Sequence, residues 1–310
     1  MIFQRTIAES IAFSGIGLHT GNRINVTLRP ADANNGIIFH RKEGERTVSI
    51  EACSDNVVDT RLATVIGKGD LKVSTVEHLM ATLYAFGIDN LHIDIDGPEV
   101  PIMDGSAGDF VEMVSKVDLV NLSVSRKYLA IRKPISVIDG EKRISIIPSR
   151  LFRVTSDIAF DHPSIALQNR SIKLSPDVFS RDIARARTFG FLNEVEYLKA
   201  NGLARGGSLD NAVVIDDNGV VNPDGLRYSD EFVRHKILDT IGDFSLTGYP
   251  ILGHVRTYKA GHDINHKTVQ KILASPDCWQ IVEFSDEDLR LALQKDLSTT
   301  ASNHLAFEKI

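Results

Sequence analysis

Residues 234–243 read Arg-His-Lys-Ile-Leu-Asp-Thr-Ile-Gly-Asp, and they predict a helix that carries one imidazole and two carboxylates. In the helix predicted here, His235, Asp239 and Asp243 stand at positions i, i+4 and i+8 and share one face. A histidine and an aspartate four residues apart can bind one metal ion together. On an exposed helix the same pair forms only a weak local hydrogen bond, so the stretch needs a third ligand from elsewhere.

A second polar pair lies far upstream, in residues 74–80, Ser-Thr-Val-Glu-His-Leu-Met. One interpretation is a capping box, in which Ser74 caps a helix and the side chain of Glu77 reaches back to it. The other interpretation is catalytic: His78 binds a metal ion, and Glu77 beside it acts as general base toward a water molecule. Both interpretations place the pair at the start of a helix.

Together, His78, His235 and Asp239 form a ligand set suited to zinc. Three protein ligands leave the fourth tetrahedral position open, as catalytic zinc requires, whereas structural sites normally fill all four positions with protein. The chain has only two cysteines, Cys53 and Cys278, without the paired spacing of a structural zinc site. We therefore predict one Zn²⁺ per chain, at a hydrolytic site.

Two further clusters offer groups for acid catalysis and for charge stabilisation. If Asp243 hydrogen-bonds His262, which lies in a glycine-containing turn, the imidazolium is favoured and its pKa rises, as a general acid needs. Thr188 follows a helix-like run and could donate to the oxyanion of a tetrahedral intermediate, to which Lys236 could add positive charge. The ordinary alternatives are a surface histidine and a structural loop.

The first half of the chain mixes strands and helices. Alternating apolar and polar residues predict strands at 24–28 and 91–95, and helical patterns occupy about 75–86 and 107–117. The polar segment 121–126 reads as a boundary between domains. This half is therefore predicted to be α+β.

The second half repeats that order of elements. Successive strands are predicted within 127–156, a helix at 176–186, then a βαβ-like segment and a helix from about 229 to 244 with Ser229 as its N-cap. After about residue 276 we expect one strand, one short helix and a polar end. Each half is thus predicted to carry two main helices.

Length and composition agree with a globular protein of two domains. The 310 residues are more than one modest domain needs, so we expect domains at 1–125 and 126–310. A formal net charge of -6 gives no support to nucleic-acid binding. The sequence shows neither a signal peptide nor an apolar run of the roughly 18 residues that span a membrane, so we expect a cytoplasmic protein without stable membrane insertion.

Several motifs, in a fixed order, resemble one known family. They are residues 14–21 (Ser-Gly-Ile-Gly-Leu-His-Thr-Gly), 73–78, 97–106 (Gly-Pro-Glu-Val-Pro-Ile-Met-Asp-Gly-Ser), the loop around Thr188, 235–239 and Gly261-His262. In these motifs the chain resembles the UDP-3-O-acyl-N-acetylglucosamine deacetylases, zinc amidases that commit bacteria to the synthesis of the lipid A of the Gram-negative outer membrane. The resemblance covers most of the chain.

The resemblance implies a role for each reactive residue. It assigns Zn²⁺ binding to the two histidines and the aspartate named above and activation of water to Glu77. It further implies that His262 protonates the leaving amine with Asp243 as its partner, that Thr188 donates to the oxyanion, and that Lys236 contacts the substrate and the transition state. These assignments coincide with the roles argued from the residues alone.

The resemblance also implies a fold and a binding site for the substrate. The family has two topologically similar domains, each a β-sheet with two main helices, and the helices are sandwiched between the two sheets. A βαβ insertion in the second domain, here about 191–222, forms an apolar passage for the acyl chain. The residues expected to contact the substrate in this passage, near the uridine and diphosphate, or beside the site are Phe191, Val195, Leu198, Ala204, Gly207, Phe160, Lys259 and Leu62.

Other interpretations use the same residues. Two histidines and one carboxylate are also the facial triad of non-haem Fe(II) oxygenases, but that chemistry gives no task to a glutamate beside a ligand. A catalytically silent module that only binds the lipid-linked sugar nucleotide is a further alternative, although every reactive residue is in place. The protein is expected to be a monomer, and Arg61 departs from the apolar residue that the family usually places beside the site.

Overall fold

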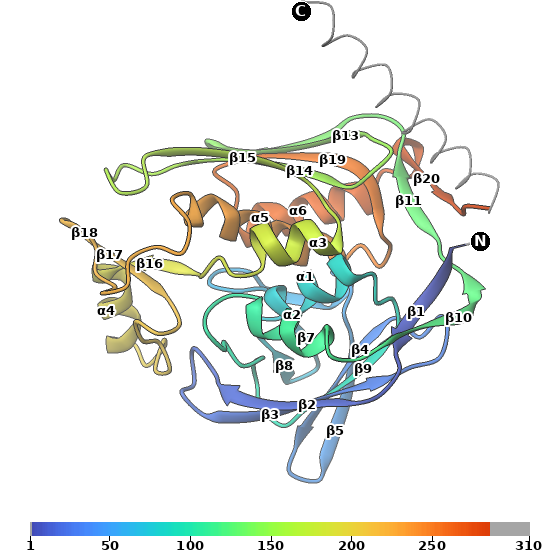
Figure 1. The fold of residues 1–310 in the computed structure, drawn as a ribbon, viewed down its shortest axis with the longest axis horizontal. Coiled ribbons are helices and arrows are strands. Elements are labelled where there is room, and N and C mark those ends of the chain that lie inside the picture. Colours follow the sequence, from blue (N-terminus) through green and yellow to red (C-terminus); the bar gives the residue numbers. More distant parts are fainter. Residues whose placement is uncertain (1, 286–310) are drawn as a thin grey trace, which may run out of the picture.

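The computed structural model describes residues 2–285, in which two β-sheets enclose a layer of helices (Figure 1). The first sheet runs in the order β2 (Ile11–Ile16), β3 (Arg23–Pro30), β9 (Leu91–Ile95), β4 (Ile37–Glu43) and β5 (Arg46–Glu51). Its inner face follows the period of two residues of a half-buried strand: in β3, Ile24, Val26 and Leu28 are each 1% exposed. The strands predicted at 24–28 and 91–95 are confirmed, and they pair with each other.

The second sheet repeats the strand order of the first. Its strands lie in the order β12 (Ile135–Asp139), β13 (Lys142–Pro148), β19 (Ile251–Tyr258), β14 (Arg153–Ala159) and β15 (Leu167–Lys173). In each sheet the central strand pairs antiparallel with the second strand and parallel with the fourth. Two more strands, β11 (Tyr128–Ile131) and β20 (Trp279–Val282), extend the second sheet. The prediction of an α+β protein with two similar halves is confirmed.

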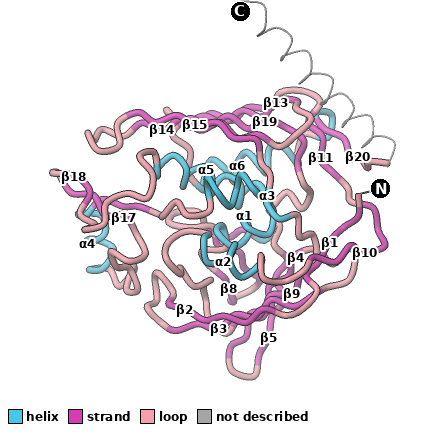
Figure 2. The backbone as a smooth tube through the Cα atoms, viewed as in Figure 1, coloured by secondary structure: helices cyan, strands magenta, loops and turns pink. Residues whose placement is uncertain are grey.

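The helices between the sheets also correspond in the two halves (Figure 2). In the first half α1 (Glu77–Phe86) precedes the central strand β9 and α2 (Gly108–Val114) follows it. In the second half α5 (Glu231–Ser245) precedes β19 and α6 (His262–Leu273) follows it. The apolar patterns of residues 75–86 and 107–117 therefore predicted real helices, each somewhat longer than the one observed.

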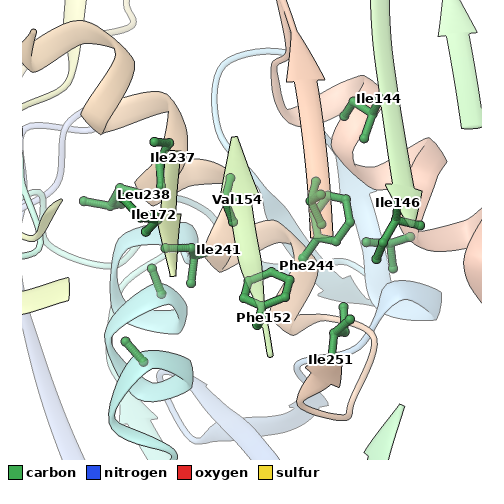
Figure 3. Close-up of a cluster of buried hydrophobic side chains, with 14 of the residues drawn as sticks. Ile144, Ile146, Phe152, Val154, Ile172, Ile237, Leu238, Ile241, Phe244 and Ile251 are labelled. Carbon is green, nitrogen blue, oxygen red and sulfur yellow. The ribbon is translucent and has the colours of Figure 1, made fainter. Parts of the chain in front are cut away.

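One face of α5 packs on the second sheet. Its apolar residues, Ile237, Leu238, Ile241 and Phe244, are all 0% exposed and meet strand residues of β13, β14, β15 and β19 (Figure 3). Two alanines of α1, Ala81 and Ala85, belong to the same cluster. The opposite face of α5 is thereby turned toward α1, and it carries the polar residues singled out in the sequence.

Both predicted N-caps are wrong. Helix α1 begins at Glu77 after Val76, and Ser74 instead forms a β-bridge with Glu99, so the capping box is absent. Helix α5 begins at Glu231 after Asp230, whose carboxylate binds two arginines. The backbone of Ser74 is thus extended and paired with a distant segment, and the carboxylate of Asp230 binds arginines and does not cap its helix.

The second main helix of the second half was also placed wrongly. Residues 176–183 form only a short helix, α3 (Pro176–Val178), followed by a π-helical turn at Phe179–Ile183. The second long helix is α6, which the sequence analysis treated as a turn around His262. Its amphipathic pattern, with Ile264, Val269 and Ile272 buried, was the signal available.

The polar segment 121–126 is not an open linker. It lies in and directly after β10 (Leu119–Ser125), which pairs antiparallel with β1 (Phe3–Ile7). The strands predicted within 127–156 are confirmed, as is the strand after residue 276. The short helix expected near the C-terminus falls outside the described residues.

Each half carries a small sheet between its fifth strand and its first long helix. In the first half it consists of β6 (Val57–Asp59), β7 (Val65–Lys68) and β8 (Leu71–Val73). In the second half β16 (Phe189–Phe191), helix α4 (Leu192–Ala200) and the parallel strand β17 (Val213–Asp216) form the βαβ unit, and β18 (Gly219–Val220) completes it. Among residues 2–285, no helix is long and apolar enough to span a membrane.

Candidate metal centre and active site

The site lies where α1 and α5 cross. A Cβ atom on Gly242 of α5 would stand 2.1 Å from the backbone oxygen of Glu77, so only a glycine permits this approach of the two helices. The first turn of α1 consequently lies beside the polar face of α5. Residues separated by more than 150 positions in the sequence, His78 and His235, come into ring contact with centroids 5.0 Å apart.

Three buried side chains at this crossing could hold a metal ion. One donor atom from each of His78, His235 and Asp239 lies within 4.8 Å of the other two. Nε2 of His235 is 3.3 Å and Nε2 of His78 is 3.8 Å from Oδ1 of Asp239. All three residues are at most 4% exposed.

The chemistry of these three residues fits a metal ion. Oδ1 of Asp239 is buried and has no hydrogen-bond partner, while Oδ2 accepts from Lys236 at 2.9 Å. Nδ1 of His235 donates to the backbone oxygen of Ala186, which leaves Nε2 with a free lone pair facing Asp239. A buried carboxylate oxygen without a partner is costly unless a cation binds it.

The charge states of the cluster suit the same purpose. Burial lowers the pKa of His78, helped by the nearby His235, to about 3, and burial also lowers the pKa of His235. Burial works against the charge of Asp239, but His235 and Lys236 outweigh it and hold the pKa of this carboxyl well below its usual range. Two neutral imidazoles and one carboxylate are the protonation states that metal ligands need.

Glu77 and His262 face each other beside this cluster. Oε1 of Glu77 lies 3.7 Å from Nε2 of His262. Burial raises the pKa of Glu77 to about 7, although the charge of His262 opposes the shift. Burial alone would lower the pKa of His262, but the negative charges of Asp243 and Glu77 and the hydrogen bond to Asp243 raise it to about 10.

Asp243 lies behind His262 and away from the cavity. Its Oδ2 atom accepts a hydrogen bond from Nδ1 of His262 at 2.9 Å and another from Nδ2 of Asn265 at 2.8 Å. Nδ1 donates to this carboxylate, and the raised pKa of His262 keeps a second proton on Nε2, which faces Glu77. The structure thus contains the pairing that the sequence analysis expected between these residues.

A cavity of about 320 Å³ opens onto these groups. Of the predicted site residues it is lined by His78, His235, Asp239, Glu77, His262, Lys236, Thr188 and Leu62. The backbone of Thr188 is fixed on both sides, because its N–H donates to the oxygen of Gly105 and its oxygen accepts from Val213. The buried ion pair of Arg187 with Glu231 ties the same loop to the start of α5.

The remaining predicted substrate contacts lie around the cavity and outside its lining. The ring of Phe160 contacts those of Phe189 and Phe191 in the βαβ unit, and Phe189 lines the cavity. Val195 lies on α4 next to Gly190, 3.5 Å from the position of a Cβ there. The structure therefore gathers these apolar residues at one side of the site.

Gly207 and Lys259 do not line the cavity. A Cβ on Gly207 would lie 3.6 Å from Leu18, which lines the cavity. Lys259 has a left-handed backbone, with φ of 53°, and its ammonium group pairs with Glu141. Arg61 also lines the cavity, and its guanidinium binds Asp59 while its side chain is 86% exposed.

Sequence reasoning missed three residues of the site. Lys142 lines the cavity from the second sheet, and Asn265 binds Asp243. Thr64 donates its hydroxyl to Asp243 at 2.5 Å and its N–H to Glu77 at 3.1 Å. A local sequence pattern cannot predict the contact between Thr64 and Asp243, because the two residues are 179 positions apart.

Comparison with known proteins agrees with this arrangement. The family model described as UDP-3-O-acyl N-acetylglycosamine deacetylase matches residues 4–274. A protein of Syntrophotalea carbinolica named UDP-3-O-acyl-N-acetylglucosamine deacetylase is 68% identical over 91% of this chain and 92% of its own length. Proteins of the same name from Citrifermentans bemidjiense and a Geobacter species are 58% and 57% identical, each over 93% of this chain and 94% of their own length. The chain belongs to the UDP-3-O-acyl N-acetylglycosamine deacetylase family.

Proposed function

We propose that this protein is a zinc-dependent amidase that hydrolyses the N-acetyl group of UDP-3-O-acyl-N-acetylglucosamine in lipid A biosynthesis, releasing acetate and the free amine. Family membership supports the deacetylation. The observation that carries the zinc-dependent mechanism is the buried Asp239 oxygen without a partner, facing two neutral imidazoles. Glu77 and His262 next to it supply a base and an acid.

His78, His235 and Asp239 are the residues that would hold one Zn²⁺. When bound, the ion supplies Lewis acidity at the acetamide carbonyl and favours the ionisation of an attacking water. Because these three residues line a cavity that is open to solvent, the substrate would approach from the solvent side. Fe²⁺ or Co²⁺ would also suit these ligands, so the choice of metal belongs to the test.

Glu77 is the proposed general base. Its Oε2 atom is held by the N–H of Thr64, and its Oε1 atom faces the cavity region near His262. A carboxyl group with a pKa raised to about 7 is half ionised at neutral pH and is a stronger base than an ordinary glutamate. Glu77 would take the proton of the attacking water.

His262 is the proposed general acid. A pKa raised to about 10 keeps the imidazole protonated at neutral pH, and the hydrogen bond to Asp243 directs the second proton, on Nε2, into the cavity. Protonation of the amine as the C–N bond breaks makes it a neutral leaving group. Each of these two proton transfers typically contributes roughly 10²–10⁴-fold in rate.

Thr188 and Lys236 would stabilise the negative charge that develops on the acetamide oxygen. Thr188 lines the cavity on a loop whose backbone is fixed by hydrogen bonds, so its hydroxyl would donate with little reorganisation. The ammonium group of Lys236 binds Asp239 and lies 5.3 Å from the ring centre of Phe189. It therefore places a positive charge at the mouth of the metal cluster.

Residues in and around the cavity would bind the rest of the substrate. We propose that Phe160 and Lys259 meet the uridine and the diphosphate, and that Leu62 contacts the sugar side of the cavity. Phe191, Val195 and Gly207 would border the acyl chain, supported by the cluster of apolar rings that joins the βαβ unit to the cavity. We further propose that the protein acts in the cytoplasm as a monomer whose two domains are residues 1–125 and 126–310.

The first test is deacetylation of UDP-3-O-acyl-N-acetylglucosamine by metal-stripped protein, with Zn²⁺, Fe²⁺ or Co²⁺ added back in stoichiometric amount. We expect activity to return with Zn²⁺ and acetate to be released in a one-to-one ratio with the amine. Because no redox step is involved, the rate should be the same with and without oxygen. A dependence on oxygen would favour an Fe(II) oxygenase.

Matched variants assign the metal site. His78→Ala should lose both zinc and turnover, whereas Glu77→Ala and His262→Ala should retain zinc and lose most turnover. His40→Ala, on the first sheet beside His92, is the control and should behave as the wild type. Substrate binding without turnover in the zinc-loaded wild type would instead identify a silent binding module.

A further inference from the structure

Thr64 joins two acidic residues of the site that come from different halves of the chain. It lies between β6 and β7 and is 2% exposed. Its backbone is tied to the start of α1, because its N–H donates to Oε2 of Glu77 at 3.1 Å and its oxygen accepts from Val76 at 3.3 Å. Its hydroxyl donates in the other direction, to Oδ1 of Asp243 on α5 at 2.5 Å, and the same hydroxyl oxygen lies 3.4 Å from Nδ1 of His262.

The carboxylate of Asp243 depends on this hydroxyl for one of its two oxygens. Oδ2 accepts from His262 and from Asn265, and both donors belong to α6. The hydrogen bond from Thr64 is the one described for Oδ1. A carboxylate held at both oxygens cannot rotate, whereas a carboxylate held at one oxygen can turn about its terminal bond.

We propose that Thr64 is a positioning residue, whose hydroxyl holds Asp243 and, through Asp243 and its own contact with Nδ1, the direction in which His262 faces Glu77. This inference rests on the proposed roles of Glu77 and His262. The distance between Oε1 of Glu77 and Nε2 of His262 is 3.7 Å, and an acid and a base that serve one reacting centre must keep such a separation. Thr64 is the one residue of the described chain that hydrogen-bonds both Glu77 and Asp243.

The hydroxyl rather than the shape of Thr64 carries the proposed effect. Valine has nearly the same shape and retains the backbone bonds to Glu77 and Val76, but it cannot donate to Asp243. Serine keeps the hydroxyl and loses only a methyl group. Thr64→Val and Thr64→Ser therefore separate hydrogen bonding from packing.

Steady-state kinetics with zinc-loaded protein is the first measurement. We expect Thr64→Val to lower kcat by roughly 10–100-fold, the usual effect of removing a residue that orients a site group, with KM within about twofold of the wild type. Zinc content should stay at one per chain, because the hydroxyl does not contact a proposed ligand. Thr64→Ser should recover most of kcat.

A second measurement does not depend on activity. In ¹⁵N-histidine-labelled protein without metal, the Nδ1 proton of His262 should exchange with water about tenfold faster in Thr64→Val than in the wild type, because the charge-assisted bond to Asp243 opens more often. Thr64→Ser should exchange at nearly the wild-type rate. This measurement tests the positioning role of Thr64 even if the wild type does not deacetylate the proposed substrate.

Thr257→Val provides the matched control. Thr257 is also 2% exposed, and its hydroxyl donates to Ser156 at 2.9 Å within the second sheet, away from the cavity. It should lose a comparable amount of stability while keeping kcat and slow exchange of the His262 proton. An active wild type with unchanged kcat and proton exchange in Thr64→Val would overturn the positioning role, as would an equal loss of kcat in Thr257→Val.

Discussion

At the scale of single residues, the candidate site places a carboxyl group with a raised pKa beside an imidazole with a raised pKa. Glu77 and Asp243 are both buried carboxyl groups, but only Asp243 has donors at both of its oxygens. Burial therefore raises the pKa of Glu77, and the charge of Asp243 helps to raise the pKa of His262. The proposed base and the proposed acid are thus the same kinds of side chain that form ordinary ion pairs elsewhere.

Removing the charge of Asp243 should lower the pKa of His262. In Asp243→Asn one of the three carboxylates that favour the imidazolium is gone, so the pKa of His262 should fall from about 10 by roughly 1–3, the size typical of a nearby charge. NMR titration of the histidine rings measures this directly. His254, far from Asp243 and with a pKa lowered by burial, is the internal control, and an unchanged His262 would remove the proposed partnership.

Replacing Glu77 by glutamine should stabilise the metal-free protein at alkaline pH. A carboxyl group whose pKa rises from 4.5 to about 7 on folding favours the folded state below pH 4.5, and this contribution is lost as the pH rises through 7. The variant escapes that loss. Its free energy of unfolding in urea should therefore exceed that of the wild type at pH 8, and the difference should shrink at pH 5.

The exposed residue Glu9 offers the control, since Glu9→Gln should change the free energy of unfolding little at either pH. A Glu77→Gln protein that is less stable than the wild type at pH 8 would show that the carboxylate is held favourably. Its proposed basicity would then lack a physical source. A substitution such as Glu77→Gln that raises stability and lowers activity is common at residues with a catalytic role.

At the scale of elements, the crossing of α1 and α5 creates the site. Helix α5 presents apolar residues to the second sheet and His235, Asp239 and Asp243 to α1, because residues four apart share a face. Gly242 lies on the α1 side as well, and its missing side chain sets how closely the helices approach. The separation of the three proposed metal ligands is therefore set by helix packing.

Gly242→Ala should disturb the metal site without touching a ligand. The new Cβ would overlap the backbone oxygen of Glu77, so α1 has to move, at a cost of roughly 1–3 kcal/mol in stability. We expect zinc affinity, measured by competition with a chromogenic chelator, to fall by roughly 10–100-fold. Ile241→Val, one residue earlier and facing the sheet, should lose about 0.5–1.5 kcal/mol and retain its zinc affinity.

At the scale of the whole molecule, each half has its own hydrophobic cluster, and residues of both halves meet at the candidate site. Ala81 and Ala85 of the first half belong to a cluster made mainly by residues of the second half. His78 comes from the first half, whereas His235 and Asp239 come from the second. Neither half holds a complete set of ligands.

Zinc should therefore stabilise the protein as a single unit. At a free zinc concentration 100 times Kd, the free energy of unfolding should rise by about 2.7 kcal/mol, in one transition by calorimetry. His78→Ala should show little of this gain. Two separate transitions, of which only that of the second half responds to zinc, would show that residues 126–285 bind the metal without His78.

The sequence predicted those features that follow from local periodicity and from the identity of reactive side chains. Alternation predicted β3 and β9, and the i, i+4 spacing in α5 placed His235 and Asp239 on one face. The cap at Ser74 failed because the backbone there pairs with a distant segment, and the cap at Ser229 failed because α5 begins one residue later, after Asp230. Helix α6 was not predicted, because Gly261 directly before its first residue, His262, was interpreted as part of a turn.

By itself, the sequence determined that the chain is α+β with two similar halves and that it carries two histidines, an aspartate and a glutamate suited to metal-assisted hydrolysis. Periodicity and side-chain chemistry are local properties, so they can be read without a structure. Only the tertiary structure decided that α1 and α5 meet at Gly242, that Oδ1 of Asp239 lacks a partner, and that Thr64 joins Glu77 to Asp243. These features depend on how segments far apart in the chain pack together, and a local sequence pattern does not show which distant segments will meet.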